Sequence, residues 1–375
     1  MYATIASLAI IMMAAAAPAQ AANSSADARF KALYTREWAW REEQFAGADD
    51  EDSEKPADHL PKIDPATQDM QLRYWQDVMK ELDAIPRAAL SPANRINYDV
   101  YKPQIAVLIA DQQFREYEKP LNSDTTFWTD LGYTARKDYH TAEDYKSYIA
   151  QLRDIPRYFR DQIANMRAGL KRGFTPPRVT LAGRDASVAA VADAKPQDSL
   201  FYTPFKEMPV SIPADEQAKL RADASKAISD SVVPAYRDLL AFLRNDYIPH
   251  ARIALAAESL PDGKAYYRSK ILEFTTLDMD PDAIHKLGLS EVAKIHAEMI
   301  DTMHATGFKG DFPAFLHYLR TDPRFYAKTP NELLMRAAFI VSSISAWIFA
   351  TSDRPSAWIA AGSMSSVVNS RILER

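Results

Sequence analysis

The sequence predicts a mainly α-helical fold, and three observations support this prediction. First, a capping side chain stands directly before a proline at four places: Asp64-Pro65, Ser91-Pro92, Asp280-Pro281 and Thr329-Pro330. Such pairs are typical of helix starts, because the cap accepts a free backbone N–H and proline has none to satisfy. Second, apolar residues follow these pairs at spacings of three and four. Third, only 10 of 375 residues are glycine, whereas sheets with phosphate-binding loops usually use more.

Two stretches behind these starts carry the clearest apolar faces. They consist of Leu72, Trp75, Val78, Met79 and Leu82 in the first, and Ile284, Leu287, Leu289, Val292, Ile295 and Met299 in the second. Residues spaced three and four apart lie on one side of a helix. Each stretch is therefore expected to form a helix with one face turned toward other parts of the protein.

Further helix boundaries are indicated between these two stretches. Thr141 and Asp144 resemble a capping box, with Asp in place of the usual Glu. Gly173 stands where a helix is expected to end. The long periodic stretch from Ala214 to Tyr247 is expected to be helical, with a kink or break at Pro234.

Signals for other structure are few. Pro177–Leu181 and Met208–Ile212 are the two candidates for short extended segments, but neither has a hairpin partner nearby. Gly47–Asp64 and Asp185–Pro213 are polar and contain proline, so they are predicted to be loops. No internal repeat is visible.

The N-terminus resembles an export signal. Ile5 to Ala17 form an uninterrupted apolar run, and Ala19 and Ala21 then give an A-x-A cleavage site. This run suits a signal-peptide core better than a membrane span. We expect residues 1–21 to be removed by cleavage after Ala21, which leaves a periplasmic or secreted protein without a stable membrane span. The alternative is an uncleaved anchor or a misplaced start, because no Lys or Arg precedes the run.

The C-terminal end differs in composition from the rest of the chain. Between residues 337 and 375 the only charged residues are Asp353, Arg354, Arg371, Glu374 and Arg375. Serine, alanine and isolated aromatic residues alternate there without helix caps. We therefore divide the mature chain into a helical region, 22–338, and a divergent tail, 339–375, that is either frameshifted or cut short.

Composition excludes several classes of function. The net charge is −5 and the isoelectric point about 5.9, whereas nucleic-acid binding normally needs a basic excess. The absence of cysteine rules out disulfides, thiolate metal sites and cysteine nucleophiles. The H-E-x-x-H, G-x-S-x-G, Walker and G-x-G-x-x-G motifs are absent as well.

The histidines do not form a metal site by sequence spacing. His285 and His296 share one face of a predicted helix but lie about 16 Å apart along it, too far to bind one zinc ion. His304 is also too distant from His296. The acidic run 49–54 lacks the spacing of a calcium loop, so a solvated loop is the better interpretation. No metal ligand is assigned.

Three residues are candidate substrate contacts. Asp262-Gly263 predicts a turn, and Tyr266 and Tyr267 open the helix that follows. Their side chains point about 100° apart, so one can face a cleft while the other packs, and a phenol there could polarise a carbonyl group. Arg324 lies in a predicted turn and could bind a peptide carboxylate. For all three, a purely structural role is the alternative.

Several runs in the second half of the chain resemble those of a bacterial family, the domain of unknown function 885. They are Phe201-Tyr202-x-Pro204-Phe205, Leu243 to Pro249, Leu260 to Tyr267, Thr275-Thr276, Ile284 to Val292 and Tyr318 to Tyr326. The resemblance covers roughly residues 28–338. It implies an exported, elongated array of helices that corresponds to the N-terminal half of a zincin-like metallopeptidase.

Full-length relatives would carry an H-E-A-x-P-G-H-H type zinc motif beyond the matched region, and this sequence lacks it. No zinc ligand or catalytic residue can therefore be assigned, and zinc is expected only in full-length relatives. The resemblance thus implies a truncated peptidase relative, inactive as it stands, whose substrates are small peptides. The alternative is a non-enzymatic periplasmic protein that binds peptides or serves as a scaffold. If the catalytic half is missing, Phe339, Trp347, Phe349 and Trp358 are expected to lack a partner surface.

Overall fold

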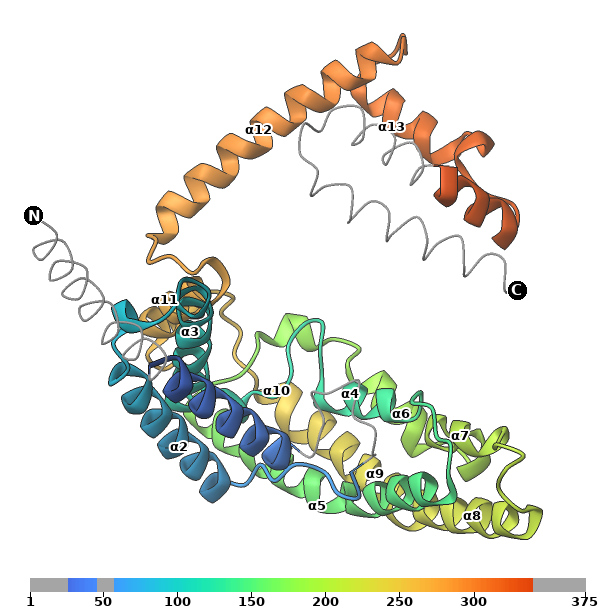
Figure 1. The fold of residues 1–375 in the computed structure, drawn as a ribbon. Helices are drawn as coiled ribbons and strands as arrows, with labels where there is room; N and C mark the ends of the chain where they lie inside the picture. The colour runs from blue at the N-terminus through green and yellow to red at the C-terminus, as the bar shows by residue number, and fades with distance from the viewer. Residues whose placement is uncertain (1–25, 46–56, 340–375) are drawn as a thin grey trace, which may run out of the picture. The chain divides into compact units, whose positions relative to one another are not determined.

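Helices make up most of the part of the chain that the computed structural model describes, residues 26–45 and 57–339 (Figure 1). The predicted signal peptide and nearly all of the predicted tail lie outside these residues. Within them no strand forms, and the extended pairing is limited to one isolated bridge between Leu121 and Thr126. The prediction of a mainly α-helical protein is confirmed. No helix of the described part combines the length and apolarity needed to cross a membrane.

The chain divides into two compact units, Met1–Met279 and Asp280–Arg375. Residues 26–45 form the first described helix. The α-helices that follow in the first unit are α2 (Pro65–Asp83), α3 (Pro92–Phe114), α4 (Phe127–Thr134), α5 (Ala142–Arg172), α6 (Asp185–Ala192), α7 (Thr203–Lys206), α8 (Ala214–Ala227), α9 (Val233–Phe242), α10 (Ile248–His250) and α11 (Gly263–Thr275). The second unit contains α12 (Pro281–Ala305), α13 (Phe312–Thr321) and a helical segment at 330–339.

Short helices of other types connect these elements. The 3-10 helices are Arg87–Ala89, Glu116–Glu118, Arg178–Leu181, Pro196–Asp198, Leu200–Tyr202, Ala257–Ser259 and Pro323–Phe325, and the π-helical turns are Ile228–Val232 and Leu243–Tyr247.

The predicted helix starts are confirmed. The side chains of Asp64, Ser91 and Asp280 each accept backbone N–H groups of the helix that they precede, and Thr329 accepts the N–H of Glu332. Thr141 and Asp144 form a complete capping box at the start of α5. That helix ends at Gly173, whose φ of 79° lies in the left-handed region that glycine tolerates best.

The structure refines one prediction of local structure, because the chain does not break at Pro234, and it contradicts another. The helical run that begins at Ala214 is not broken at Pro234 but continues to His250, with a π-helical turn before each of the prolines Pro234 and Pro249. Proline lacks the N–H that an α-helix would use, and a wider turn accommodates that loss. The predicted loop at 185–213 contains α6 and α7.

The two candidate extended segments also differ from the prediction. Residues 178–181 form a 3-10 helix, and residues 208–212 are irregular with a turn. Neither has a neighbouring strand, and a lone extended segment leaves its backbone groups without sheet partners.

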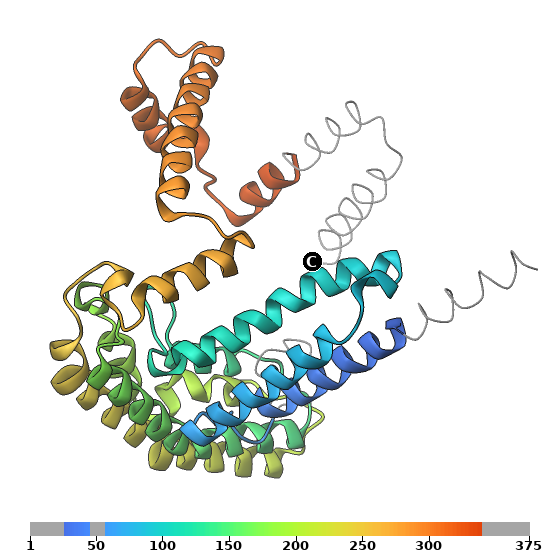
Figure 2. The same ribbon diagram turned by 90° about the vertical axis from the view of Figure 1, so that its left-hand side faces the viewer.

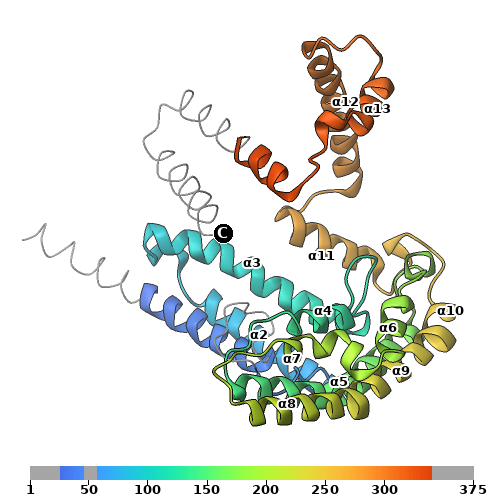
Figure 3. The ribbon, with the colours of Figure 1, turned by 90° about the vertical axis from the view of Figure 1, so that its right-hand side faces the viewer.

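The first unit has two main cores. In the first, Phe30 and Leu33 of helix 26–45 pack with Trp75 of α2 and Ile105 of α3, and these helices run side by side in Figure 2. In the second, α5 lies against α8 and α9 (Figure 3), with Phe159 and Tyr236 among the buried residues that they share. A third, smaller cluster joins Phe174 to Leu260 and Tyr266 at the base of α11.

Candidate functional site

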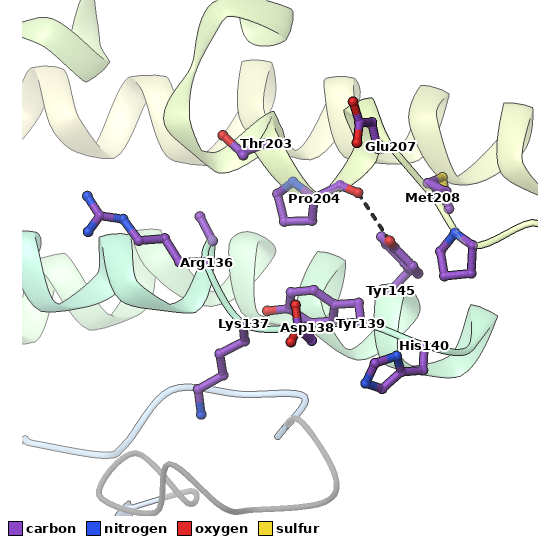
Figure 4. Close-up of a pocket in the computed structure, with 12 residues that line it drawn as sticks. Arg136, Lys137, Asp138, Tyr139, His140, Tyr145, Thr203, Pro204, Glu207 and Met208 are labelled. Carbon is purple, nitrogen blue, oxygen red and sulfur yellow. Dashed lines mark hydrogen bonds between the residues drawn. The ribbon is translucent and has the colours of Figure 1, made fainter. Parts of the chain in front are cut away.

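A pocket of about 460 Å³ lies in the first unit, between the loop that joins α4 to α5 and the segment around α7 (Figure 4). Its volume falls in the range of small-molecule sites. The lining residues are 135–140, Tyr145, Thr203, Pro204 and 207–209.

Hydrogen bonds hold the loop on one side of this pocket. Tyr139 donates its hydroxyl to the carbonyl of Thr134, at 2.7 Å, which closes the loop back on the end of α4. The backbone N–H groups of His140 and Thr141 donate to the Asp144 carboxylate at 3.0 and 2.8 Å. The capping box that was visible in the sequence therefore fixes one wall of the pocket.

A tyrosine connects the two sides. Tyr145, in the first turns of α5, donates its hydroxyl to the carbonyl of Pro204 in α7, at 3.1 Å (Figure 4). Its ring lies 5.4 Å from that of Tyr139 and 5.3 Å from that of Phe205. Burial raises the pKa of both tyrosines. Because both phenols are neutral and already donate to carbonyl groups, they are not available for acid–base chemistry. Both side chains are buried, so they support the wall of the pocket by packing.

The rim of the pocket carries charges of both signs. Arg136, Lys137, Asp138 and Glu207 are exposed, and the Arg136 guanidinium lies over the ring of Tyr133 at 5.5 Å. The side chains of Lys137, Asp138 and Glu207 form no hydrogen bond or ion pair with any other described residue. Within the described structure they are free to contact a ligand that has both a positive and a negative group.

A second concentration of charge lies where α11 meets α3. The Lys270 ammonium contacts three carboxylates: Asp111 at 2.7 Å, Glu273 at 2.8 Å and Glu116 at 3.3 Å. Burial alone would lower the pKa of Lys270, but the hydrogen bonds that it donates to Asp111 and Glu273 and the charge of Glu116 outweigh burial and raise the pKa. The amine therefore stays protonated and cannot act as a nucleophile.

The pKa values of two carboxylates beside Lys270 shift in opposite directions. Burial raises the pKa of Asp111 despite its contact with Lys270. Burial also acts to raise the pKa of Glu116, but the positive charge of Lys119, the hydrogen bond from Tyr266 and the charge of Lys270 together lower it. The Lys270 ammonium thus joins Glu273 of α11 to Asp111 of α3 and fastens the two helices together.

The two tyrosines predicted as substrate contacts point in different directions. Tyr266 is only 8% exposed, with its ring edge-to-face against Phe114 and Phe174 at 5.6 and 5.5 Å. Burial, followed by its hydrogen bond to Glu116, raises its pKa. Tyr267 is 47% exposed. Tyr266 is therefore a packed residue of the α11–α3 junction, and Tyr267 is the one that solvent reaches.

Arg324 belongs to the second unit. Its guanidinium pairs with Asp322 at 2.8 Å and donates to the Tyr318 hydroxyl at 2.8 Å, so a ligand carboxylate would have to compete with Asp322. Neither Arg324 nor the two tyrosines line the pocket described above.

The histidines of α12 lie apart from one another. His285, His296 and His304 are exposed, and His296 packs edge-to-face on Phe312 at 5.2 Å. In the described part of the chain, no group of three or more His, Asp or Glu side chains is arranged to hold a metal ion.

Sequence reasoning missed the pocket because its lining comes from two distant loops. Asp138, Tyr139 and Glu207 belong to no catalytic motif, and residues 185–213 were expected to be a plain loop. The available signal was the concentration of tyrosines next to the capping box at Thr141.

Comparison with protein families shows the family to which the chain belongs. The family model "Bacterial protein of unknown function (DUF885)" matches residues 42–357. The chain belongs to this family. No curated protein matches the sequence.

A solved structure shares the fold of this DUF885 protein. It is described as "putative lipoprotein from Colwellia psychrerythraea" and superposes with a TM-score of 0.72 at 16% sequence identity. The similarity covers 88% of this chain and 60% of the other, so this chain spans less than two thirds of that protein's length. At this identity the likeness shows the fold alone.

Proposed function

We propose that this DUF885 protein binds small peptides in the pocket between α4–α5 and α7. The observation that carries the proposal is a pocket whose lining is polar and apolar in about equal measure, with a rim that carries charges of both signs. A short peptide has the same character, since it carries an amino group and a carboxylate at the ends of a partly apolar chain. Apolar walls with a few polar groups are what such ligands usually meet in proteins.

Under this proposal the chain is an exported relative of zinc-dependent peptidases. The apolar run at 5–17 and the A-x-A site support export to the periplasm or secretion. The resemblance of the second half of the chain to zincin-like enzymes supports peptides as the ligand class. Hydrolysis would need a metal-bound water whose pKa is lowered to about 7. We expect binding without turnover from residues 22–375, because no zinc ligand can be assigned among them.

Calorimetric titration with a panel of unblocked dipeptides and tripeptides tests the proposal. The double variant Asp138→Asn, Glu207→Gln removes both negative rim charges without breaking a contact to a described residue. We expect it to weaken binding at least tenfold relative to the native protein. Asp215→Asn, an exposed carboxylate outside the pocket, is the matched control and is expected to bind normally.

Two results would contradict the proposal. The first is that no peptide of the panel binds, and the second is that the double variant binds as tightly as the native chain. Stoichiometric zinc in the purified protein, together with chelator-sensitive hydrolysis of the same peptides, would instead replace binding alone with catalysis.

A further inference from the structure

Four residues, 276–279, connect the last helix of the first unit to the first helix of the second. α11 ends at Thr275, and Asp280 is the N-cap of α12. The division between the two compact units falls at the end of this segment, after Met279. Any change in the direction of the chain between the units has to be absorbed by these few residues.

The segment begins with an unfavourable backbone conformation. Thr276 has a φ of 59° and a ψ of 10°, in the left-handed region. A β-branched side chain is crowded there, whereas glycine is not. The conformation is retained because the N–H of Thr276 bonds to the carbonyl of Leu272 at 2.8 Å, which caps the end of α11.

The two helices cannot relax into one continuous helix. Pro281 is the first residue of α12 and has no N–H to continue the hydrogen-bond ladder. Its ring also disfavours a helical Asp280, which is extended with a ψ of 134°. α11 and α12 therefore remain separate helices.

The hydrogen bonds and ion pair of segment 276–279 are local. Asp278 folds back onto α11 and pairs with Arg268 through two bonds, Nε–Oδ1 at 2.8 Å and Nη2–Oδ2 at 2.5 Å. The Thr275 hydroxyl accepts the N–H of Leu277 at 3.1 Å, and its one proton lies within reach of the carbonyls of Ile271 at 2.7 Å and Leu277 at 3.0 Å. Within the described residues, every hydrogen bond and ion pair of segment 276–279 ends on α11 or inside the segment itself.

We propose that residues 276–279 form a hinge between the two units, and that the Arg268–Asp278 ion pair is its latch. Both latch side chains are mostly exposed, at 71% and 61%. Salt screens exposed ion pairs, so the latch is a weak, salt-sensitive restraint on a strained turn. Closing or releasing it changes how far the hinge can swing without disturbing the core of either unit.

The absence of cysteine from the sequence makes a direct test simple. Lys219→Cys on α8 and Lys309→Cys in the second unit replace exposed residues, and spin labels at both report the distance between the units in the full chain. Pulsed electron resonance is expected to give a narrower distance distribution at low salt than at high salt. About 1 M NaCl, where the screening length is about 3 Å, is expected to widen it.

Charge-reversal variants test whether the Arg268–Asp278 ion pair is the latch. Arg268→Glu alone and Asp278→Arg alone are each expected to widen the distribution at low salt, and the double reversal is expected to restore the narrow one. Thr276→Gly keeps the ion pair but leaves the left-handed region readily, so it is also expected to widen the distribution.

The proposal requires all of these results. It is overturned if salt does not widen the distance distribution of the native chain, if the single reversals match the native chain, if the double reversal stays as broad as the single reversals, or if Thr276→Gly has no effect. Far-UV circular dichroism of each variant shows whether its helices are intact. The test uses no peptide, so it does not depend on the proposed function.

Discussion

Helices α2 and α12 begin in the same way and end up in opposite environments. Each starts with an aspartate cap and a proline, and each has apolar residues spaced three and four apart. In α2 the apolar face is buried, with Trp75 only 1% exposed, whereas in α12 Val292 is 65% exposed.

The difference lies in what packs against each helix. The face of α2 is covered by helix 26–45 and by α3, which contribute Phe30 and Ile105 to the same core. Among the described helices, α12 packs chiefly against α13, and its one fully buried residue is Met303 near its end. An apolar period therefore predicts a helix and its face, but not whether another element covers that face.

The largest effect that this comparison predicts is for truncation of the α2 core. Trp75→Ala removes a buried indole that also donates to Glu37 at 3.1 Å, and it is expected to lower the free energy of unfolding by about 3–5 kcal/mol. Val292→Ala on α12 is the matched control and is expected to cost less than about 0.5 kcal/mol. Urea unfolding followed by circular dichroism measures both. A cost above about 1 kcal/mol for Val292→Ala would mean that the α12 face is covered in solution.

A smaller effect is expected from the buried carboxylate beside Trp75. Glu37 accepts hydrogen bonds from Arg41, at 2.7 Å, and from the Tyr101 hydroxyl, at 3.1 Å. Glu37→Gln keeps an acceptor but removes the charge, and it is expected to cost about 1–3 kcal/mol. Glu291→Gln on α12 breaks only an exposed contact to Lys294 at 3.9 Å and is expected to change stability by less than about 0.5 kcal/mol. Urea unfolding measures both variants. Equal losses of unfolding free energy would contradict the contrast between the buried core around α2 and the exposed surface of α12.

The N-cap residues of α2 and α12 are both aspartates, so the two helices can be compared where their local chemistry is the same. Asp64 accepts the N–H groups of Ala66 and Thr67, and Asp280 accepts those of Asp282 and Ala283. Asp64→Ala is expected to cost about 1 kcal/mol of global stability, because the first turn of α2 is tied to a core. Asp280→Ala is expected to fray the start of α12 and leave the unfolding of the first unit unchanged. Hydrogen exchange distinguishes local fraying from a loss of global stability. A loss of global stability in Asp280→Ala would show that α12 is coupled to the core.

Much of the fold was predictable because helix starts are local. A cap, a proline and a capping box act within four residues, and the sequence shows them directly at Asp64, Ser91 and Thr141. The helices at 185–192 and 203–206 were missed because they are short and lack caps of this kind. The π-helical turns before Pro234 and Pro249 were missed because the usual rule for an internal proline is a kink.

The candidate site was much less predictable than the fold. Tyr139 and Glu207 lie 68 positions apart in the sequence, and only the packing of α5 against the segment around α7 brings their loops together. Tyr266 and Tyr267 were singled out as a pair, and adjacency could not tell which would be buried. Tyr266 is the buried one because Phe114 and Phe174 pack against its ring, and both are distant from it in the sequence.

The smallest expected effect is the acid sensitivity that Asp64 gives to α2. The Thr67 hydroxyl donates to its carboxylate at 2.7 Å, and this bond, with those from the backbone N–H groups, holds the pKa of Asp64 below its usual value of 3.8. A carboxyl whose pKa is lowered by folding stabilises the fold fully above its usual pKa and loses that contribution as the pH falls toward the folded value.

Asp64→Asn keeps an acceptor at the cap but does not titrate. Between about pH 5 and pH 2 the native chain is therefore expected to lose stability faster than the variant, by less than about 1 kcal/mol. Urea unfolding at a series of pH values measures the difference. Parallel curves would show that the cap bonds do not favour the ionised carboxylate. Convergence of the two stabilities in acid, with the native chain more stable at neutral pH, is the expected result and would assign this part of the acid response to the start of α2.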